Sequence, residues 1–196
     1  MESTATELAS LLRKLEEAFP AVPLISADLV TTDPGYLDLE RMGLKRKFGG
    51  RLWTSLSFED LQGEAGCFGF LTPEAFRYYL PAFIRFTLLD PVRADLIVDA
   101  ILSSFASPDQ RDYFQRRLPD YLATLKRLGI PASAFQEPEP WDSEEEASFR
   151  AERIASLTPK QKAVVRDFVA FLKARRSEAF MPGELEAVLE ALEETP

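Results

Sequence analysis

The stretch that decides the fold is residues 70–86, which read FLTPEAFRYYLPAFIRF. It opens with a helix start signal, because the Thr72 hydroxyl can accept a backbone N–H of the first turn and Pro73 suits the first helical position. At about 100° per residue, one face of this helix is apolar. That face carries Phe76, Tyr79, Leu80, Phe83 and Phe86. We therefore expect a central core helix over about residues 72–89.

The opposite face of this helix is more polar and contains a proline. Pro81 has no N–H for the carbonyl of Arg77, so we expect a kink that costs about 3 kcal/mol in isolation. Two interpretations stay open. The bend fits the helix to its neighbours, or the polar face beside the freed carbonyl binds an anionic group. The candidate ligand-binding residues are Glu74, Arg77, Tyr78 and Arg85.

Helical spacing and start signals recur along the rest of the chain. They predict helices near 4–18, 36–48, 57–61, 93–105 and 183–194, and two more that begin after Ser107 and Thr158. Residues 20–35 read as an extended crossing segment, with one short strand considered near 22–31. Residues 63–69 and the acidic, proline-containing segment 136–148 read as loops. The sequence therefore predicts a single all-α domain over 1–196, an irregular helical bundle around the kinked central helix.

Composition argues against an enzyme, and leaves only chemistry by carboxylate, lysine or tyrosine side chains open. The chain contains no histidine and one cysteine, Cys67. Ser–His–Asp and Cys–His nucleophilic sites and imidazole-dependent zinc sites are therefore excluded. Asp95 and Asp99 lie one helical turn apart, but we expect them to be solvated or paired with an arginine such as Arg77 or Arg85. We expect no catalytic residue, no metal site and no cofactor.

The charge and the apolar runs limit the classes of partner. The net charge is −9, which disfavours nucleic acid, since phosphate binding needs a basic face. The sequence has no run of eighteen apolar residues, so we expect no membrane-spanning helix. The acidic N-terminus lacks the basic region of a signal peptide, so we expect a cytoplasmic protein.

The acidic charge is concentrated. Residues 137–152 hold seven acids and one base, residues 184–194 hold five acids and no base, and the helix between them is basic. One interpretation is that these charges neutralise one another within the chain. The other is that the acidic segment docks a basic partner protein. The candidate partner-binding residues are Trp141, Asp142, Glu144, Glu145 and Glu146.

The central motif resembles the signature of a family of small bacterial proteins of unknown function. The resemblance rests on FLTPEAFRYYLPAF at residues 70–83, with looser matches at Trp53 and at the LTPKQ start of residues 157–161. It implies a helical fold and a bacterial, cytoplasmic source. It carries no catalytic residue to transfer.

We therefore expect a non-enzymatic protein-binding protein, an adaptor or an inhibitor, with an immunity protein against a bacterial toxin as the concrete form. The alternative is a regulatory module that senses a small anionic ligand with the kinked central helix. The sequence leaves the oligomeric state open.

Overall fold

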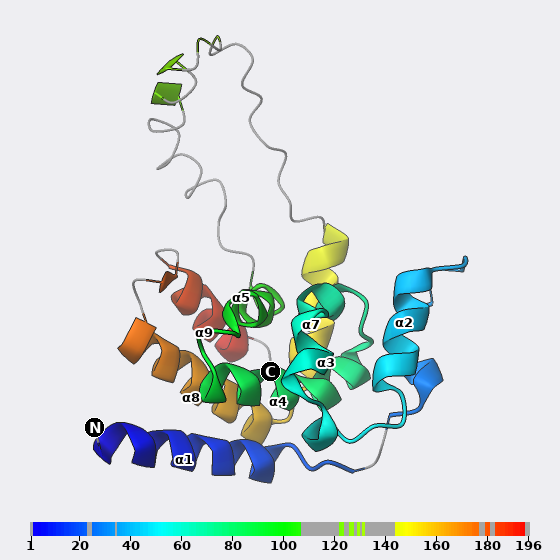
Figure 1. Ribbon diagram of the computed structural model, residues 1–196, viewed down its shortest axis with the longest axis horizontal. Coiled ribbons are helices and arrows are strands. Elements are labelled where there is room, and N and C mark those ends of the chain that lie inside the picture. The colour runs from blue at the N-terminus through cyan, green and yellow to red at the C-terminus, as the bar shows by residue number, and fades with distance from the viewer. Residues whose placement is uncertain are drawn as a thin grey trace.

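The computed structural model describes residues 2–22, 25–33, 35–106, 122–123, 126–127, 129, 131, 144–176, 179–180 and 183–194. Within these residues the fold is all-α, as the sequence predicts (Figure 1). The α-helices are α1 (Glu2–Ala18), α2 (Leu39–Phe48), α3 (Phe58–Gln62), α4 (Pro73–Leu89), α5 (Asp95–Ser103), α7 (Glu144–Ser156), α8 (Pro159–Arg176) and α9 (Glu184–Glu194). The shorter 3-10 helices are η1 (Ala27–Leu29), η2 (Trp53–Ser55) and η3 (Ala65–Gly69).

Helix α4 is the centre of the bundle and contacts α1, α5, α7 and η2. It begins as the sequence predicts, with the Thr72 hydroxyl accepting the Ala75 N–H at 3.1 Å. The helix continues through Pro81 to Leu89. Tyr78 and Pro81, on the face expected to be polar, are also buried, because α4 has neighbours on several sides.

An aromatic core surrounds α4. Phe83 lies with its ring centroid 4.6 Å from that of Phe68 and 6.4 Å from that of Phe48. Phe48 in turn lies 5.1 Å from Tyr79. Trp53 is also buried, and its indole N–H donates to the Phe19 carbonyl at 3.0 Å. These contacts agree with the core of aromatic side chains that the motif predicts.

Helix α8 packs between two neighbours, with α1 on one side and α9 on the other (Figure 1). Helix α8 starts with the expected capping box. The Thr158 N–H donates to the Gln161 side chain at 2.9 Å, and the Gln161 N–H donates to the Thr158 hydroxyl at 3.3 Å. Local start signals therefore place this helix correctly.

Backbone hydrogen bonds connect both ends of the segment that carries α2 to neighbouring parts of the chain. The Gly50 N–H donates to the Ile25 carbonyl at 2.8 Å, and Thr31 forms an isolated antiparallel bridge with Leu71. In place of the short strand considered near 22–31, the described residues there form the turn η1 and this single bridge. Figure 1 shows α2 at the edge of the molecule.

Three boundaries differ from the sequence expectations. Helix α2 begins at Leu39 because the Asp38 carboxylate caps it, accepting the Glu40 and Arg41 N–H groups. Residues 65–69 form η3 where a loop was expected, and residues 144–148, expected in the acidic loop, are the first turns of α7. The helix expected to begin after Ser107 lies outside the described residues.

In the part of the chain that the structure describes, no helix has both the length and the apolar character needed to cross a membrane.

Candidate functional site

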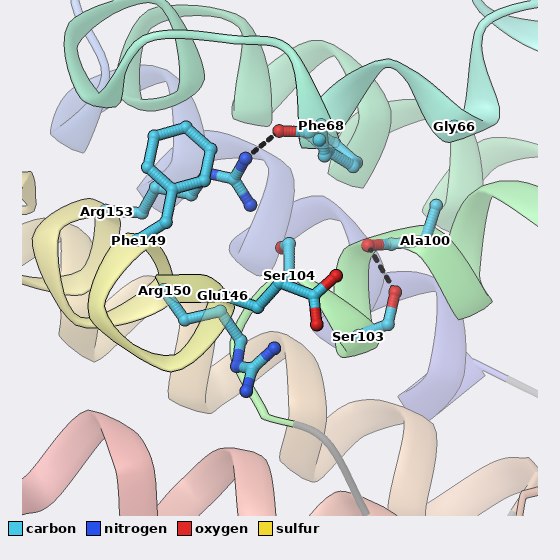
Figure 2. Close-up of a pocket in the computed structure, with 10 residues that line it drawn as sticks. Gly66, Phe68, Ala100, Ser103, Ser104, Glu146, Phe149, Arg150 and Arg153 are labelled. Atoms are coloured by element: carbon cyan, nitrogen blue, oxygen red, sulfur yellow. Dashed lines mark hydrogen bonds between the residues drawn. The ribbon is translucent and has the colours of Figure 1, made fainter. Parts of the chain in front are cut away.

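A pocket of about 270 Å³ lies where η3, α5 and α7 meet (Figure 2). The glycines of η3 and the small residues of α5 leave the space, and α7 supplies the long side chains. The residues that line it are Gly66, Phe68, Gly69, Ala100, Ser103, Ser104, Glu146, Phe149, Arg150 and Arg153.

Arg153 is the unusual residue of this pocket, because it is only 4% exposed. One terminal nitrogen, Nη2, donates to the Phe68 carbonyl, and Nε has no hydrogen-bond partner. The guanidinium stacks on the Phe149 ring at 4.0 Å and lies 5.5 Å from the Phe76 ring centroid. None of the ion pairs found among the described residues neutralises it.

The surroundings of Arg153 do not supply a counter-charge. Burial lowers the pKa of Arg153 to about 10, so the side chain is still a cation at neutral pH. The Cys67 thiol acts against that shift, but burial raises the pKa of the thiol, which therefore stays neutral at pH 7. Cys67 is thus a small, buried side chain of the core.

The other polar groups of the pocket are engaged within the chain. The Ser103 hydroxyl donates to the Ala100 carbonyl at 3.2 Å, and the Ser104 hydroxyl donates to the Ile101 carbonyl at 2.6 Å. Arg150 and Glu146 each have an interaction of their own. Figure 2 shows the Glu146 carboxylate near the two serines and the Arg150 guanidinium pointing away from Phe68. The arrangement can hold an anionic group at Arg153.

A second feature is an exposed apolar surface, the α2 apolar face, which consists of Tyr36, Leu37, Leu39 and Met42. Tyr36, Leu37 and Leu39 are 71%, 76% and 75% exposed, and Met42 is 47% exposed. Leu39 and Met42 lie on the same side of α2 because they are three residues apart. The inner side of this helix is anchored by Leu44 and Phe48, which are fully buried.

Basic side chains border the α2 apolar face. Arg41 pairs with Asp38 at 3.0 Å, and Lys47 pairs with Glu64 at 2.7 Å. Lys45 and Arg46 have no ion pair with a described residue. The outer side of α2 therefore carries the exposed apolar side chains Leu39 and Met42 together with the cations Lys45 and Arg46.

The structure separates the ligand-binding residues predicted on α4. Arg77 donates to the Ser156 carbonyl at 3.2 Å and the Tyr78 hydroxyl to the Ala21 carbonyl at 2.7 Å. Arg85 donates to the Thr54 carbonyl at 3.5 Å, and Glu74 is exposed. These side chains reach three different parts of the chain and do not converge on one site, so their role in anion binding stays a prediction.

The predicted partner-binding residues lie at and before the start of α7. Trp141 and Asp142 lie outside the described residues. Glu144 and Glu145 are the first residues of α7, and Glu146 is exposed at the Arg153 pocket. A basic partner for this segment stays a prediction.

Of the two aspartates of α5, Asp95 forms an ion pair and Asp99 is partly buried. Asp95 lies 3.8 Å from Arg176, so its partner is on α8, whereas the sequence suggested Arg77 or Arg85 on α4. Partial burial and the neighbouring Asp95 raise the pKa of Asp99. Among the described residues, no group of three acidic, cysteine or histidine side chains could hold a metal ion.

Arg153 and Phe149 were missed by reasoning from the sequence. The acids at 144–146 were interpreted as part of an acidic loop, although acidic residues are also favoured in the first turn of a helix. Phe149 and Arg153 are four residues apart, the spacing that stacks a side chain on its neighbour one turn away. That spacing, followed by Ile154 and Leu157, was the available signal for α7.

Comparison with known proteins gives one match. A family model described as a family of unknown function (DUF6714) matches residues 7–128, which is more than half of the chain. No curated protein and no solved structure matches the chain. The matched residues include α2, η3 and α5, whereas α7 with Arg153 lies beyond them.

Proposed function

We propose that this chain, which belongs to the DUF6714 family of unknown function, is a non-enzymatic protein-binding protein that captures its partner on the α2 apolar face. The observation that carries the proposal is the exposure of that face. Four large apolar side chains within seven residues face solvent, at the edge of the bundle (Figure 1). Exposed apolar side chains gathered in one short segment are typical of interaction sites.

The rim of the α2 apolar face defines the chemistry of the partner. Lys45 and Arg46 have no acidic partner among the described residues, so an acidic group on the other protein would complement them. The partner surface is therefore apolar at its centre and acidic at its edge. Burying aromatic and aliphatic anchors at the centre of such a contact supplies most of the affinity.

The biological form of the proposal is an adaptor or an inhibitor in a bacterial cytoplasm, with an immunity protein against a bacterial toxin as its most concrete version. Three properties support this form: the small size of the chain, its acidity and the absence of histidine. The α2 apolar face lies within the residues that the family model matches.

The test is affinity capture of the tagged full-length protein, followed by binding kinetics with the purified partner. The test variant replaces both Leu39 and Met42 by Glu, and the matched control is Leu96→Glu on α5. Leu96 is 70% exposed, close to the 75% of Leu39, so the control places one of the two added charges on a comparably exposed apolar position. We expect the control to bind like the wild type and the double variant to lose at least tenfold in affinity.

Two outcomes contradict the proposal. A partner held equally by the wild type and the double variant removes the α2 apolar face as the binding surface. The other outcome is that the wild type captures no partner but self-associates, whereas the double variant is monomeric. The α2 apolar face is then the interface of a homodimer.

The acidic segment is a separate part of the proposal, with a partner of the opposite charge. Reversing Glu144, Glu145 and Glu146 to Lys should slow association with a basic partner and reduce its dependence on salt. Stopped-flow association at two salt concentrations measures both effects, and unchanged kinetics remove this segment from the interface.

A further inference from the structure

The pocket at Arg153 contains a buried cation without a counter-charge. The guanidinium is 4% exposed, makes one hydrogen bond to the Phe68 carbonyl, and leaves Nε unpaired. Buried charges in proteins are ordinarily paired or fully hydrogen-bonded, because removing them from water is costly. An uncompensated guanidinium at a pocket therefore points to an anionic group that completes it.

A second pocket in the same protein shows what a completed site looks like. It lies between α1 and α8, has a volume of about 310 Å³, and is also lined by two cations. There, Lys14 pairs with Asp167 at 2.6 Å, and Arg175 pairs with Glu7. Arg175 also stacks on Phe171 at 4.0 Å, the same distance at which Arg153 stacks on Phe149. The stacking is therefore common to both arginines, and the missing acid is specific to Arg153.

The geometry of the guanidinium favours an oxygen anion at one position. Nη2 is occupied by the Phe68 carbonyl. Figure 2 shows the other terminal nitrogen pointing away from that carbonyl, on the side of the pocket where Ser104 lies. With Nη2 bonded to Phe68, the other terminal nitrogen can donate to one oxygen of a carboxylate, and a charge-assisted contact of this kind is stronger when it is buried.

Glu146 limits the charge of the ligand. Its carboxylate lines the same pocket, so a second negative charge on a ligand would meet a like charge. Phe68, Phe149 and Ala100 supply the apolar part of the lining, and Ser103, Ser104 and Arg150 supply the rest of its polar part. The volume of about 270 Å³ is near the lower end of the roughly 300–1,000 Å³ typical of ligand pockets. The site thus suits a small, singly charged anion with an apolar body.

We propose that this pocket binds a small apolar monocarboxylate, with the carboxylate on Arg153 and the apolar body against Phe149 and Phe68. This site is independent of the α2 apolar face, which lies on a different helix. Arg153 lies beyond the residues that the family model matches, so the proposal is made for this chain.

The test uses benzoate as the probe, with the full-length protein in calorimetric titration and thermal unfolding. Benzoate should raise the unfolding temperature of the wild type, because a ligand that binds only the native state stabilises it. Benzamide, which has the same shape without the charge, should give no shift. Arg153→Met should weaken benzoate binding at least tenfold, and the matched control Arg175→Met should bind like the wild type.

A second variant keeps the proposal falsifiable if Arg153→Met does not fold. Glu146→Gln leaves the arginine in place and removes the opposing carboxylate, so it should tighten benzoate severalfold and allow inorganic phosphate to bind. Equal binding of benzoate and benzamide by the wild type, or no benzoate response at all, overturns the proposal. So does a benzoate response that Arg153→Met leaves unchanged.

Discussion

Tyr79→Phe should destabilise the protein by about 2 kcal/mol, because it removes one oxygen atom from the centre of the core. The Tyr79 hydroxyl donates to the carbonyl of Phe48, the last residue of α2, and the tyrosine is fully buried. Loss of the hydroxyl leaves that carbonyl without its donor in an apolar site. An orphaned buried group of this kind costs about 1–3 kcal/mol.

The neighbouring tyrosine provides the comparison. The Tyr78 hydroxyl donates to the Ala21 carbonyl at 2.7 Å, but this bond is only part-buried, so water can replace the lost donor. Tyr78→Phe should therefore cost less, about 0.5–1 kcal/mol. The two substitutions are chemically identical, so their difference isolates the effect of burial.

The assay is urea unfolding of wild type and both variants, followed by tryptophan fluorescence. We expect lower midpoints with an unchanged slope, and a fall in melting temperature of about 2–4 °C for each kcal/mol in a chain of this size. Equal losses in the two variants, or a loss below about 0.5 kcal/mol for Tyr79→Phe, would refute the reasoning.

Two further predictions concern the segment around α2. A Cβ at Gly49 would lie 2.6 Å from the Cα and Cβ of Ala27, so Gly49→Ala should cost about 1–3 kcal/mol in urea unfolding. Gly43→Ala, where a Cβ meets nothing within 4 Å, should be neutral or stabilising by about 0.5–1 kcal/mol, and the opposite order would contradict the packing. Arg51, together with the Ser57 N–H, lowers the pKa of Asp60 from 3.8 to about 2. Because the folded pKa is depressed, the ionised carboxylate stabilises the fold above pH 3.8, and this contribution is lost as the pH falls towards about 2. After allowance for solvent screening, since the Arg51 side chain is 36% exposed, the contribution is about 1 kcal/mol. Asp60→Asn should remove that much at neutral pH and flatten the acid limb of the stability curve, and an unchanged acid limb would contradict the assignment.

Helix α4 could be predicted from the sequence because its signals are local. The Thr72 cap, Pro73 at the first position and the apolar period all act within one or two turns, and the structure has the helix where they place it. The same holds for the capping box of α8. Local hydrogen bonds and local spacing do not depend on what the rest of the chain does.

The surroundings of α4 could not be predicted in this way. Periodicity identifies one apolar face, but it does not say that other elements cover the opposite face. Arg77 meets the carbonyl of Ser156, and Tyr78 meets that of Ala21, across separations of 79 and 57 residues. Long amphipathic side chains bury their stems and place their polar ends on distant carbonyls, and the sequence does not show which carbonyls those are.

The Arg153 pocket depends still more on tertiary structure. In the sequence, Arg153 is one basic residue after an acidic stretch, and a solvated surface position is its ordinary interpretation. It becomes a buried cation only because α7 packs against α4 and Arg153 reaches the carbonyl of Phe68 in η3. Figure 2 shows that contact, which joins residues 85 positions apart.

The backbone hydrogen bonds at both ends of the segment that carries α2 have a consequence for the thermodynamics of recognition. The Gly50–Ile25 hydrogen bond and the Thr31–Leu71 bridge fix both ends of the excursion that presents the α2 apolar face. A surface held in this way has little backbone freedom to lose when a partner arrives, so the entropy penalty of association falls mainly on its side chains. Association should then proceed in a single kinetic step, with a heat capacity change set by the buried apolar area and not by coupled folding of the segment.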